Sequence, residues 1–257
     1  MTGASIFTKI VCGVDGSPAA LEAVKQAQRL APAGAELTLV SVSESHLAVR
    51  TGMSAAEWAQ RLNEAAQAAL DDAREIVDDA QTVLLHGRAA DTFVHAVADQ
   101  DATLAAVGSH EISRTAGMLI GSVATRVLHE ARCSVLVARA GEWPWPRSIV
   151  VGLDGSDGSF AAAVVAHDVA TRMGSTVRLL VARGGSPADV AIEALAKFGY
   201  ELAFSDEKPV PALLEAARGA DLMLVGSRGV TGLRTLGSVS ERLAHHAPCS
   251  LVVVRGL

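Results

Sequence analysis

One short apolar segment occurs twice in this chain, and the repetition constrains the fold more than any other feature of the sequence. Residues 9–17 read KIVCGVDGS, and residues 148–156 read SIVVGLDGS. A second pair of segments closes each copy in the same order, because residues 121–137 are matched by residues 237–253. An opening motif and a closing motif that recur in the same order indicate one structural unit used twice.

Prolines mark the boundary between the two copies. Residues 143–146 read WPWP, and proline both lacks a backbone donor and blocks helix and central-strand hydrogen bonding. We therefore predict a first domain over residues 1–141, a linker over 142–147 and a shortened second domain over 148–257. The stretch from the Asp-Gly-Ser turn to the fourth strand is about twenty residues shorter in the second copy.

Short apolar runs alternate with helical patterns in both copies. Strands that alternate with helices imply right-handed crossovers and a mainly parallel sheet covered on both faces. The predicted fold is therefore α/β, with two tandem open, mainly parallel five-stranded sheets of Rossmann-like type. The strands are expected over residues 10–14, 37–42, 81–85, 104–107 and 134–138, and then 149–153, 177–182, 201–204, 222–225 and 251–254.

Helices are expected between these strands, over residues 19–30, 91–99 and 122–130 in the first copy. Ser54 is expected to cap a long further helix, for which nothing in the second copy provides a counterpart. Its buried face is predicted from residues that recur every three or four positions. These residues are Trp58, Leu62, Ala65, Ala69, Ala73 and Ile76.

The composition agrees with buried parallel strands and narrows the class of protein. Half of the residues are hydrophobic but only 4% are aromatic, so the core is expected to consist of Ala, Val, Leu and Ile. The net charge is −6 without a long basic run, which argues against a nucleic-acid surface.

The cysteines and the apolar runs bear on location. Cys12, Cys133 and Cys249 lack a Cys-x-x-Cys spacing and are expected to be buried thiols in a reducing compartment. No apolar run approaches the ~20 residues that span a membrane, and the N-terminus does not resemble a signal peptide. A cytoplasmic protein without a membrane partner is expected.

Glycines gather after the fourth strand of the second copy, just before a helix that begins near Ser238. Glycine lets backbone amides approach an anion, and a helix N-terminus adds unpaired N–H groups and a positive dipole end. The segment also follows the carboxyl end of a strand, where open α/β sheets bind ligands. Its composition therefore predicts a phosphate cradle.

The chain resembles the universal stress protein family in these motifs and over nearly its whole length. ATP-binding members carry Gly-x-x-Gly, a spacer of about nine residues, and then Gly-Ser or Gly-Thr. The resemblance implies an adenine-nucleotide alpha-hydrolase-like fold that holds ATP or another adenine nucleotide, accompanied by Mg²⁺, across the strand ends. The adenine is implied near the first-strand aspartate and the end of the second strand, at Asp15 and Val42 or at Asp154 and Ala182.

The phosphates are implied on the glycine loop and the start of the following helix. The residues are Gly108, Gly121, Ser122 and Val123 in the first copy, and Gly226, Arg228, Gly229, Gly237, Ser238 and Val239 in the second. Each copy departs from the family pattern. Glu111 replaces the second glycine of the first copy, although nine residues still precede Gly121. Only seven residues separate Gly229 from Gly237 in the second.

Structural roles that involve no ligand remain open for the same residues. Glycine-rich turns are common where nothing binds, and a carboxylate before Gly-Ser is explained by helix capping alone. Loop arginines either meet phosphates or are simply solvated; they are Arg114, Arg126, Arg228 and Arg234. The adjacent His245 and His246 point about 100° apart on a helix, so a metal site there is not expected.

The leading functional hypothesis is a stress-response protein that binds an adenine nucleotide in one or both halves. Ligand occupancy would then alter association or signalling rather than drive catalysis. The alternatives are a module of the same fold that acts through protein partners without a nucleotide, and an adenylating or ATP-hydrolysing enzyme. The enzyme is disfavoured because Asp-Gly-Ser stands where related enzymes carry Ser-Gly-Gly-x-Asp-Ser or His-x-Gly-His.

The resemblance also implies an assembly. Family members commonly pair through the last strand, so residues 134–138 and 251–254 are expected to form a seam between the halves. The chain would then be an internal pseudo-dimer, and a further homodimer is open.

Overall fold

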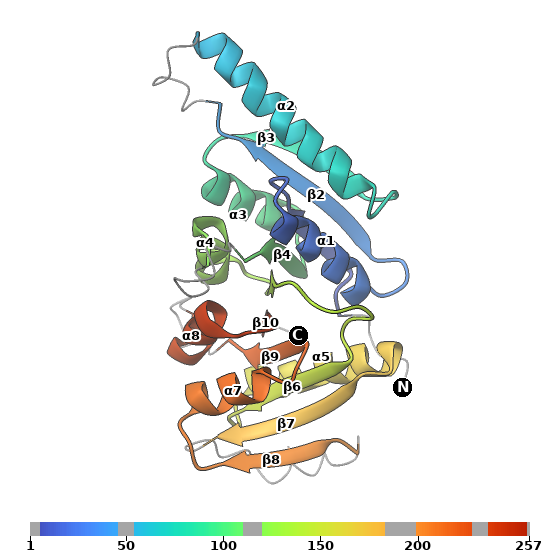
Figure 1. Cartoon of the computed structure of the whole chain (residues 1–257), viewed down its shortest axis with the longest axis vertical. Helices are drawn as coiled ribbons and strands as arrows, with labels where there is room; N and C mark the ends of the chain where they lie inside the picture. Colours follow the sequence, from blue (N-terminus) through green and yellow to red (C-terminus); the bar gives the residue numbers. More distant parts are fainter. Residues whose placement is uncertain (1–5, 46–53, 110–119, 183–198, 228–235, 256–257) are drawn as a thin grey trace.

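The computed structural model describes residues 6–45, 54–109, 120–182, 199–227 and 236–255, and these form an α/β protein. Ten strands make one continuous sheet in the order β3-β2-β1-β4-β5-β10-β9-β6-β7-β8. The first half lies above the second in Figure 1. The α/β class and the two runs of five mainly parallel strands are as predicted, and the two runs join edge to edge.

The first half contributes five strands and four helices within the described residues. In chain order they are β1 (Lys9–Gly13), α1 (Pro18–Leu30), β2 (Glu36–Ser43), α2 (Ala55–Arg74), β3 (Gln81–His86), α3 (Ala89–Asp99), β4 (Leu104–Gly108), α4 (Ser122–Glu130) and β5 (Ser134–Ala138). The helix predicted over residues 122–130 and the strand predicted over 134–138 have the observed bounds.

The second half repeats this order. Its described elements are β6 (Ser148–Leu153), α5 (Asp157–Met173), β7 (Thr176–Ala182), β8 (Glu201–Ser205), α7 (Pro209–Ala217), β9 (Leu222–Gly226), α8 (Ser238–His246) and β10 (Ser250–Val254). The prediction that this half has no counterpart of the long helix falls on residues 183–198, which lie outside the described residues.

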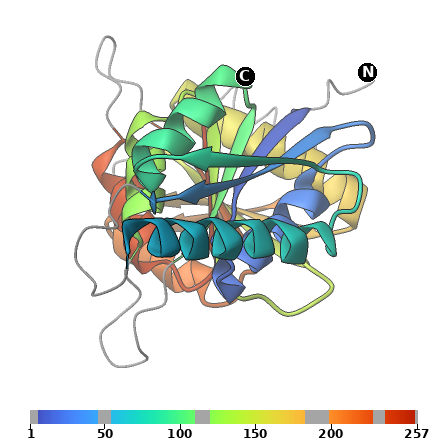
Figure 2. The ribbon, with the colours of Figure 1, turned by 90° about the horizontal axis from the view of Figure 1, so that it is seen from above.

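Helices cover both faces of the sheet. The buried core on one face includes side chains of α1, α2 and α5, and the core on the other includes side chains of α3, α4, α7 and α8. Figure 2 shows α2 and α3 on opposite sides of β2 and β3. Parallel strands buried on both faces need nearly continuous apolar sequences, which explains the aliphatic composition.

The long helix α2 begins where the sequence predicts and turns a slightly different face inward. Ser54 and Glu57 form a capping box, with Glu57 N donating to Ser54 Oγ over 3.3 Å and Ser54 N donating to Glu57 Oε2 over 3.1 Å. Ala65, expected in the buried face, is exposed, whereas its neighbour Ala66 is buried. The buried stripe of α2 is Ala66, Ala69, Leu70 and Ala73, and Val77 beyond the helix end is also buried.

The segment predicted as the linker carries a core residue. Trp145 is fully buried, and its indole Nε1 donates to the carbonyl oxygen of Asp221 over 3.1 Å. Arg29 of α1 donates from Nε to the Trp145 carbonyl oxygen over 3.3 Å. Trp145 therefore joins α1 of the first half to the segment before β9 of the second.

The cysteines are free and buried, as predicted. Burial raises the pKa of the Cys12 thiol to about 12, that of Cys133 to about 11 and that of Cys249 to about 12. These thiols therefore remain protonated and unreactive near neutral pH. Within the described residues, no helix combines the length and apolar character that crossing a membrane requires.

Candidate functional site

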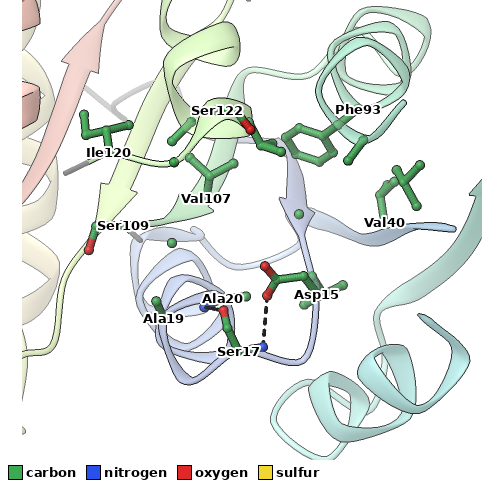
Figure 3. Close-up of a pocket in the computed structure, with 18 residues that line it drawn as sticks. Asp15, Ser17, Ala19, Ala20, Val40, Phe93, Val107, Ser109, Ile120 and Ser122 are labelled. Atoms are coloured by element: carbon green, nitrogen blue, oxygen red, sulfur yellow. Dashed lines mark hydrogen bonds between the residues drawn. The ribbon is translucent and has the colours of Figure 1, made fainter. Parts of the chain in front are cut away.

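A cavity of about 490 Å³ opens at the carboxyl ends of β1, β2 and β4, beside the N-termini of α1 and α4. Figure 3 shows it from close by. Strand ends of parallel sheets meet at one edge, so residues far apart in the sequence converge there. Six residues predicted for a ligand site in the first half line it, namely Asp15, Val42, Gly108, Gly121, Ser122 and Val123.

The turn after β1 fixes Asp15 at the cavity. Its Oδ1 accepts a hydrogen bond of 2.9 Å from Ser17 N, and Gly16 between them has φ 78°, which favours glycine. Ser17 Oγ in turn accepts from Ala20 N over 3.2 Å. The helix cap of α1 is therefore Ser17, while Asp15 braces the turn, so capping does not account for the aspartate. In Figure 3 its carboxylate points toward the middle of the cavity.

Phe93 of α3 forms an apolar wall that the sequence analysis missed. A Cβ built on Gly13 would lie 3.2 Å from the Phe93 ring, so the ring packs closely against this glycine of β1. Val40 and Val42 of β2 line the same side. A glycine inside a buried strand often marks such a close approach, and Gly13 was the signal available in the sequence.

Another part of the cavity lining, at the start of α4, is suited to an anion. Gly121 is the N-cap of α4, and no side chain caps that helix. The first N–H groups of α4 therefore face the cavity without a side-chain acceptor of their own, at the positive end of the helix dipole. The hydroxyl residues Ser109 and Ser122 lie nearby. Glu111 and Arg114 belong to residues 110–119, outside the described residues.

The second half forms an equivalent but smaller cavity of about 190 Å³. Leu213 replaces the aromatic wall, because a Cβ on Gly152 would lie 3.1 Å from its methyl groups. Asp154 Oδ1 accepts from both N and Oγ of Ser156, over 3.0 and 2.6 Å. The predicted residues that line this cavity are Asp154, Ala182, Gly226, Gly237, Ser238 and Val239; Arg228 and Gly229 lie outside the described residues.

Two other groups singled out in the sequence lie apart from the cavities. Arg126 is half exposed and forms ion pairs with Asp91 and Glu130, over 3.1 and 2.6 Å. Arg126 is therefore a surface residue, in agreement with the alternative that the loop arginines are solvated. The described residues contain no group of three or more His, Cys, Asp and Glu side chains placed to hold a metal, and this includes His245 and His246.

Fold and cavities together define a class: a tandem doubly wound α/β protein with one pocket at the strand ends of each half. The profile of the Universal stress protein family matches residues 7–139 and 194–255 of this chain. The chain belongs to the universal stress protein family, which confirms the resemblance seen in its motifs.

Relatives of similar length show the same tandem organisation across almost the whole chain. A universal stress protein of Mycobacterium tuberculosis is 28% identical over 300 residues, with 96% of each chain covered. One of Mycolicibacterium smegmatis is 29% identical over 285 residues, again with 96% of each covered. A universal stress protein structure from Archaeoglobus fulgidus superposes with a TM-score of 0.77 at 20% identity, covering 96% of this chain and 98% of that one. The last comparison supports the fold alone.

Proposed function

We propose that the first-half cavity binds an adenine nucleotide. The observation that carries the proposal is the presence of an apolar wall and an uncapped helix N-terminus in one cavity of about 490 Å³. That volume lies within the roughly 300–1,000 Å³ typical of small-molecule pockets, whereas the 190 Å³ of the second cavity lies below it. The first half is therefore the favoured binding half.

The lining residues suit the two ends of a nucleotide. Phe93, Val40 and Val42 offer apolar contact to a purine, and the acceptor oxygens of Asp15 suit an exocyclic amino group. Phosphates would meet the N–H groups at the start of α4 and the hydroxyl of Ser122. Asp15 is the only carboxylate among the described lining residues, so Mg²⁺ would be held mainly by the phosphates.

Binding rather than catalysis is the proposed role. Asp15 is also the only acid or base among the described lining residues, and the turn holds its Oδ1. General acid–base chemistry normally needs a positioned proton donor or acceptor beside the reacting atom. We therefore propose that nucleotide occupancy changes how this protein associates with partners or with a second copy. A module that acts through partners without any nucleotide is the alternative.

Titration calorimetry with ATP, ADP and cAMP tests the proposal. Gly121→Asp places a carboxylate at the start of α4, where it would repel phosphates but still cap the helix. Gly237→Asp is the matched change at the start of α8 in the second half. We expect the wild type and Gly237→Asp to bind ATP, and Gly121→Asp to bind at least about tenfold more weakly, the loss of one charge-assisted contact.

Each of the other possible calorimetry results leads to a different conclusion. Absence of binding by the wild type would overturn the proposal and favour the nucleotide-independent module. Loss of binding in Gly237→Asp but not in Gly121→Asp would assign the site to the second half instead. Light scattering with and without ATP measures the proposed change in association. A mass that stays unchanged with all tested partners would mean that ATP binds but does not control association.

A further inference from the structure

An arginine follows the last strand of each half, at the seam where β5 and β10 pair in antiparallel fashion. Arg139 follows β5, and its backbone N donates to Ser250 Oγ over 2.9 Å. Arg255 follows β10, and its backbone N donates to Ser134 Oγ over 3.1 Å. The two halves thus exchange equivalent contacts, and the seam is the one predicted from residues 134–138 and 251–254.

Each arginine side chain reaches a helix of the other half. Arg255 donates from Nη1 to the Ala131 carbonyl oxygen over 2.7 Å and from Nη2 to the Leu128 carbonyl oxygen, both at the C-terminal end of α4. Arg139 donates from Nη2 to the Ala244 carbonyl oxygen near the end of α8. A cation at a helix C-terminus complements the helix dipole, so each half stabilises a helix of its neighbour.

The helices held in this way are those that begin at the cavities. Ser122 and Val123 of α4 line the first cavity, and Ser238 and Val239 of α8 line the second. Each helix has nine residues, so roughly 13 Å separates its cavity end from its seam end. A helix this short behaves as one rigid piece, so a displacement at the cavity end is felt at the arginine.

The two arginines differ in the contacts of Nη1, which in Arg139 donates to the Cys249 carbonyl oxygen over 3.2 Å, and in those of Nε. Arg255 also donates from Nε to Ser227 Oγ over 3.4 Å, and Ser227 directly follows Gly226, which lines the second cavity. Gly226 is itself tied to α8, because its carbonyl oxygen accepts from Ser240 Oγ over 3.0 Å. The Nε of Arg139, by contrast, has no hydrogen-bond partner among the described residues, although this side chain is buried.

We infer that Arg255 couples the two cavities: ligand binding at the start of α4 alters the end of β9 and α8 through Arg255 and Ser227. The inference rests on the proposed nucleotide binding in the first half and adds a regulatory link to it. Arg255 is a positioning residue here, since it contacts neither cavity directly. The second cavity would therefore report the occupancy of the first, and the coupling acts in both directions because binding linkage is reciprocal.

Hydrogen–deuterium exchange on the full chain tests this link, with saturating ATP as the probe. The Gly237→Asp protein is the parent, because its added carboxylate disfavours phosphates at the second cavity and leaves the first open. We expect ATP to change amide exchange at the start of α4 and, by about fivefold or more, in α8 and at the end of β9. The remote change should fall below about twofold in Arg255→Gln and in Ser227→Ala, while protection at α4 persists.

The two variants and a control separate the outcomes. Ser227→Ala removes only the acceptor of Nε, so it tests the link even where Arg255→Gln weakens folding. Arg178→Gln removes an edge ion pair with Glu201, 3.0 Å long and remote from the seam, and should leave the remote change intact. No protection at α4 in the parent would overturn the nucleotide proposal and the link together. Protection at α4 without a change in α8, or a remote change that survives in Ser227→Ala, would overturn the link alone.

Discussion

Gly108, at the end of β4, lies directly against the backbone of Ala19 in α1. A Cβ at position 108 would stand 2.5 Å from the carbonyl carbon of Ala19. The second half repeats the contact, because a Cβ on Gly226 would stand 2.3 Å from the carbonyl carbon of Gly158. Backbone atoms cannot swing aside as side chains do, so both halves need glycine at this strand end for the helix to pack this closely.

The first prediction is that Gly108→Ala lowers the free energy of unfolding by about 1–3 kcal/mol, as overpacking typically does. Gly219→Ala is the matched control, because nothing lies within 4 Å of a Cβ at that position. Urea unfolding of both variants gives the comparison. Equal stabilities would show that α1 can move away from β4 freely and that the close contact is not required.

Trp145 provides the second prediction. Trp145→Ala removes a fully buried ring and its hydrogen bond to Asp221, so we expect a loss of about 3–5 kcal/mol in the free energy of unfolding. Trp143→Ala is the control within the same linker, since that ring is 45% exposed and should contribute far less. A Trp145 variant no less stable than the Trp143 variant would mean that the linker merely connects the halves.

The third prediction concerns alkaline pH. Burial raises the pKa of Cys12 from 9.0 to about 12, so the folded protein holds this proton more tightly than the unfolded chain does. The resulting stability is complete below pH 9.0 and is lost as the pH rises through about 12. Cys12→Ala lacks this dependence.

We therefore expect the stability of the wild type relative to Cys12→Ala to fall by about 2 kcal/mol as the pH rises about 1.5 units above the ordinary pKa. Denaturant unfolding at a pH well below the ordinary pKa of the thiol and at a pH about 1.5 units above it measures the difference. The other two buried thiols are present in both proteins, so their contributions cancel. Parallel pH profiles would show that the unfolded chain or a local opening releases the Cys12 proton equally easily.

The repeat and the alternation of apolar and helical segments were sufficient to predict the fold, because both depend on local sequence. Periodicity could not choose between the adjacent Ala65 and Ala66, since identical side chains give the same pattern whichever one faces the sheet. Only the packing of α2 on β2 decides that the buried stripe runs through Ala66 and Leu70. The domain bounds at residues 141 and 148 stay predictions, as does the cytoplasmic location.

The candidate site was predictable only in part, for a similar reason. Glycines and hydroxyls after the strands identified both cavities, since they belong to a local motif. Phe93 comes from a helix elsewhere in the chain, and the exchange of Arg139 and Arg255 depends on how two strand edges meet. No spacing of residues in a single sequence indicates that Phe93 lines the cavity or that the two arginines exchange between the halves.

The last prediction sets stability against binding at one residue. Gly121→Ser gives α4 an N-cap with a hydroxyl of its own, which would accept the N–H groups that now lack a side-chain cap. We expect a gain of a few tenths of a kcal/mol in the free energy of unfolding, because serine caps only slightly better than glycine. The same hydroxyl would compete with a phosphate, so ATP affinity should fall about tenfold.

Gly237→Ser is the matched variant, since Gly237 caps α8 and also lacks a side-chain cap. It should give the same small gain in stability without the loss of ATP affinity. Thermal unfolding and calorimetry on both variants separate the two effects. A fall in ATP affinity in neither variant would mean that the N–H groups of α4 do not hold the phosphates, and a fall in both would mean that α8 contributes to binding as well.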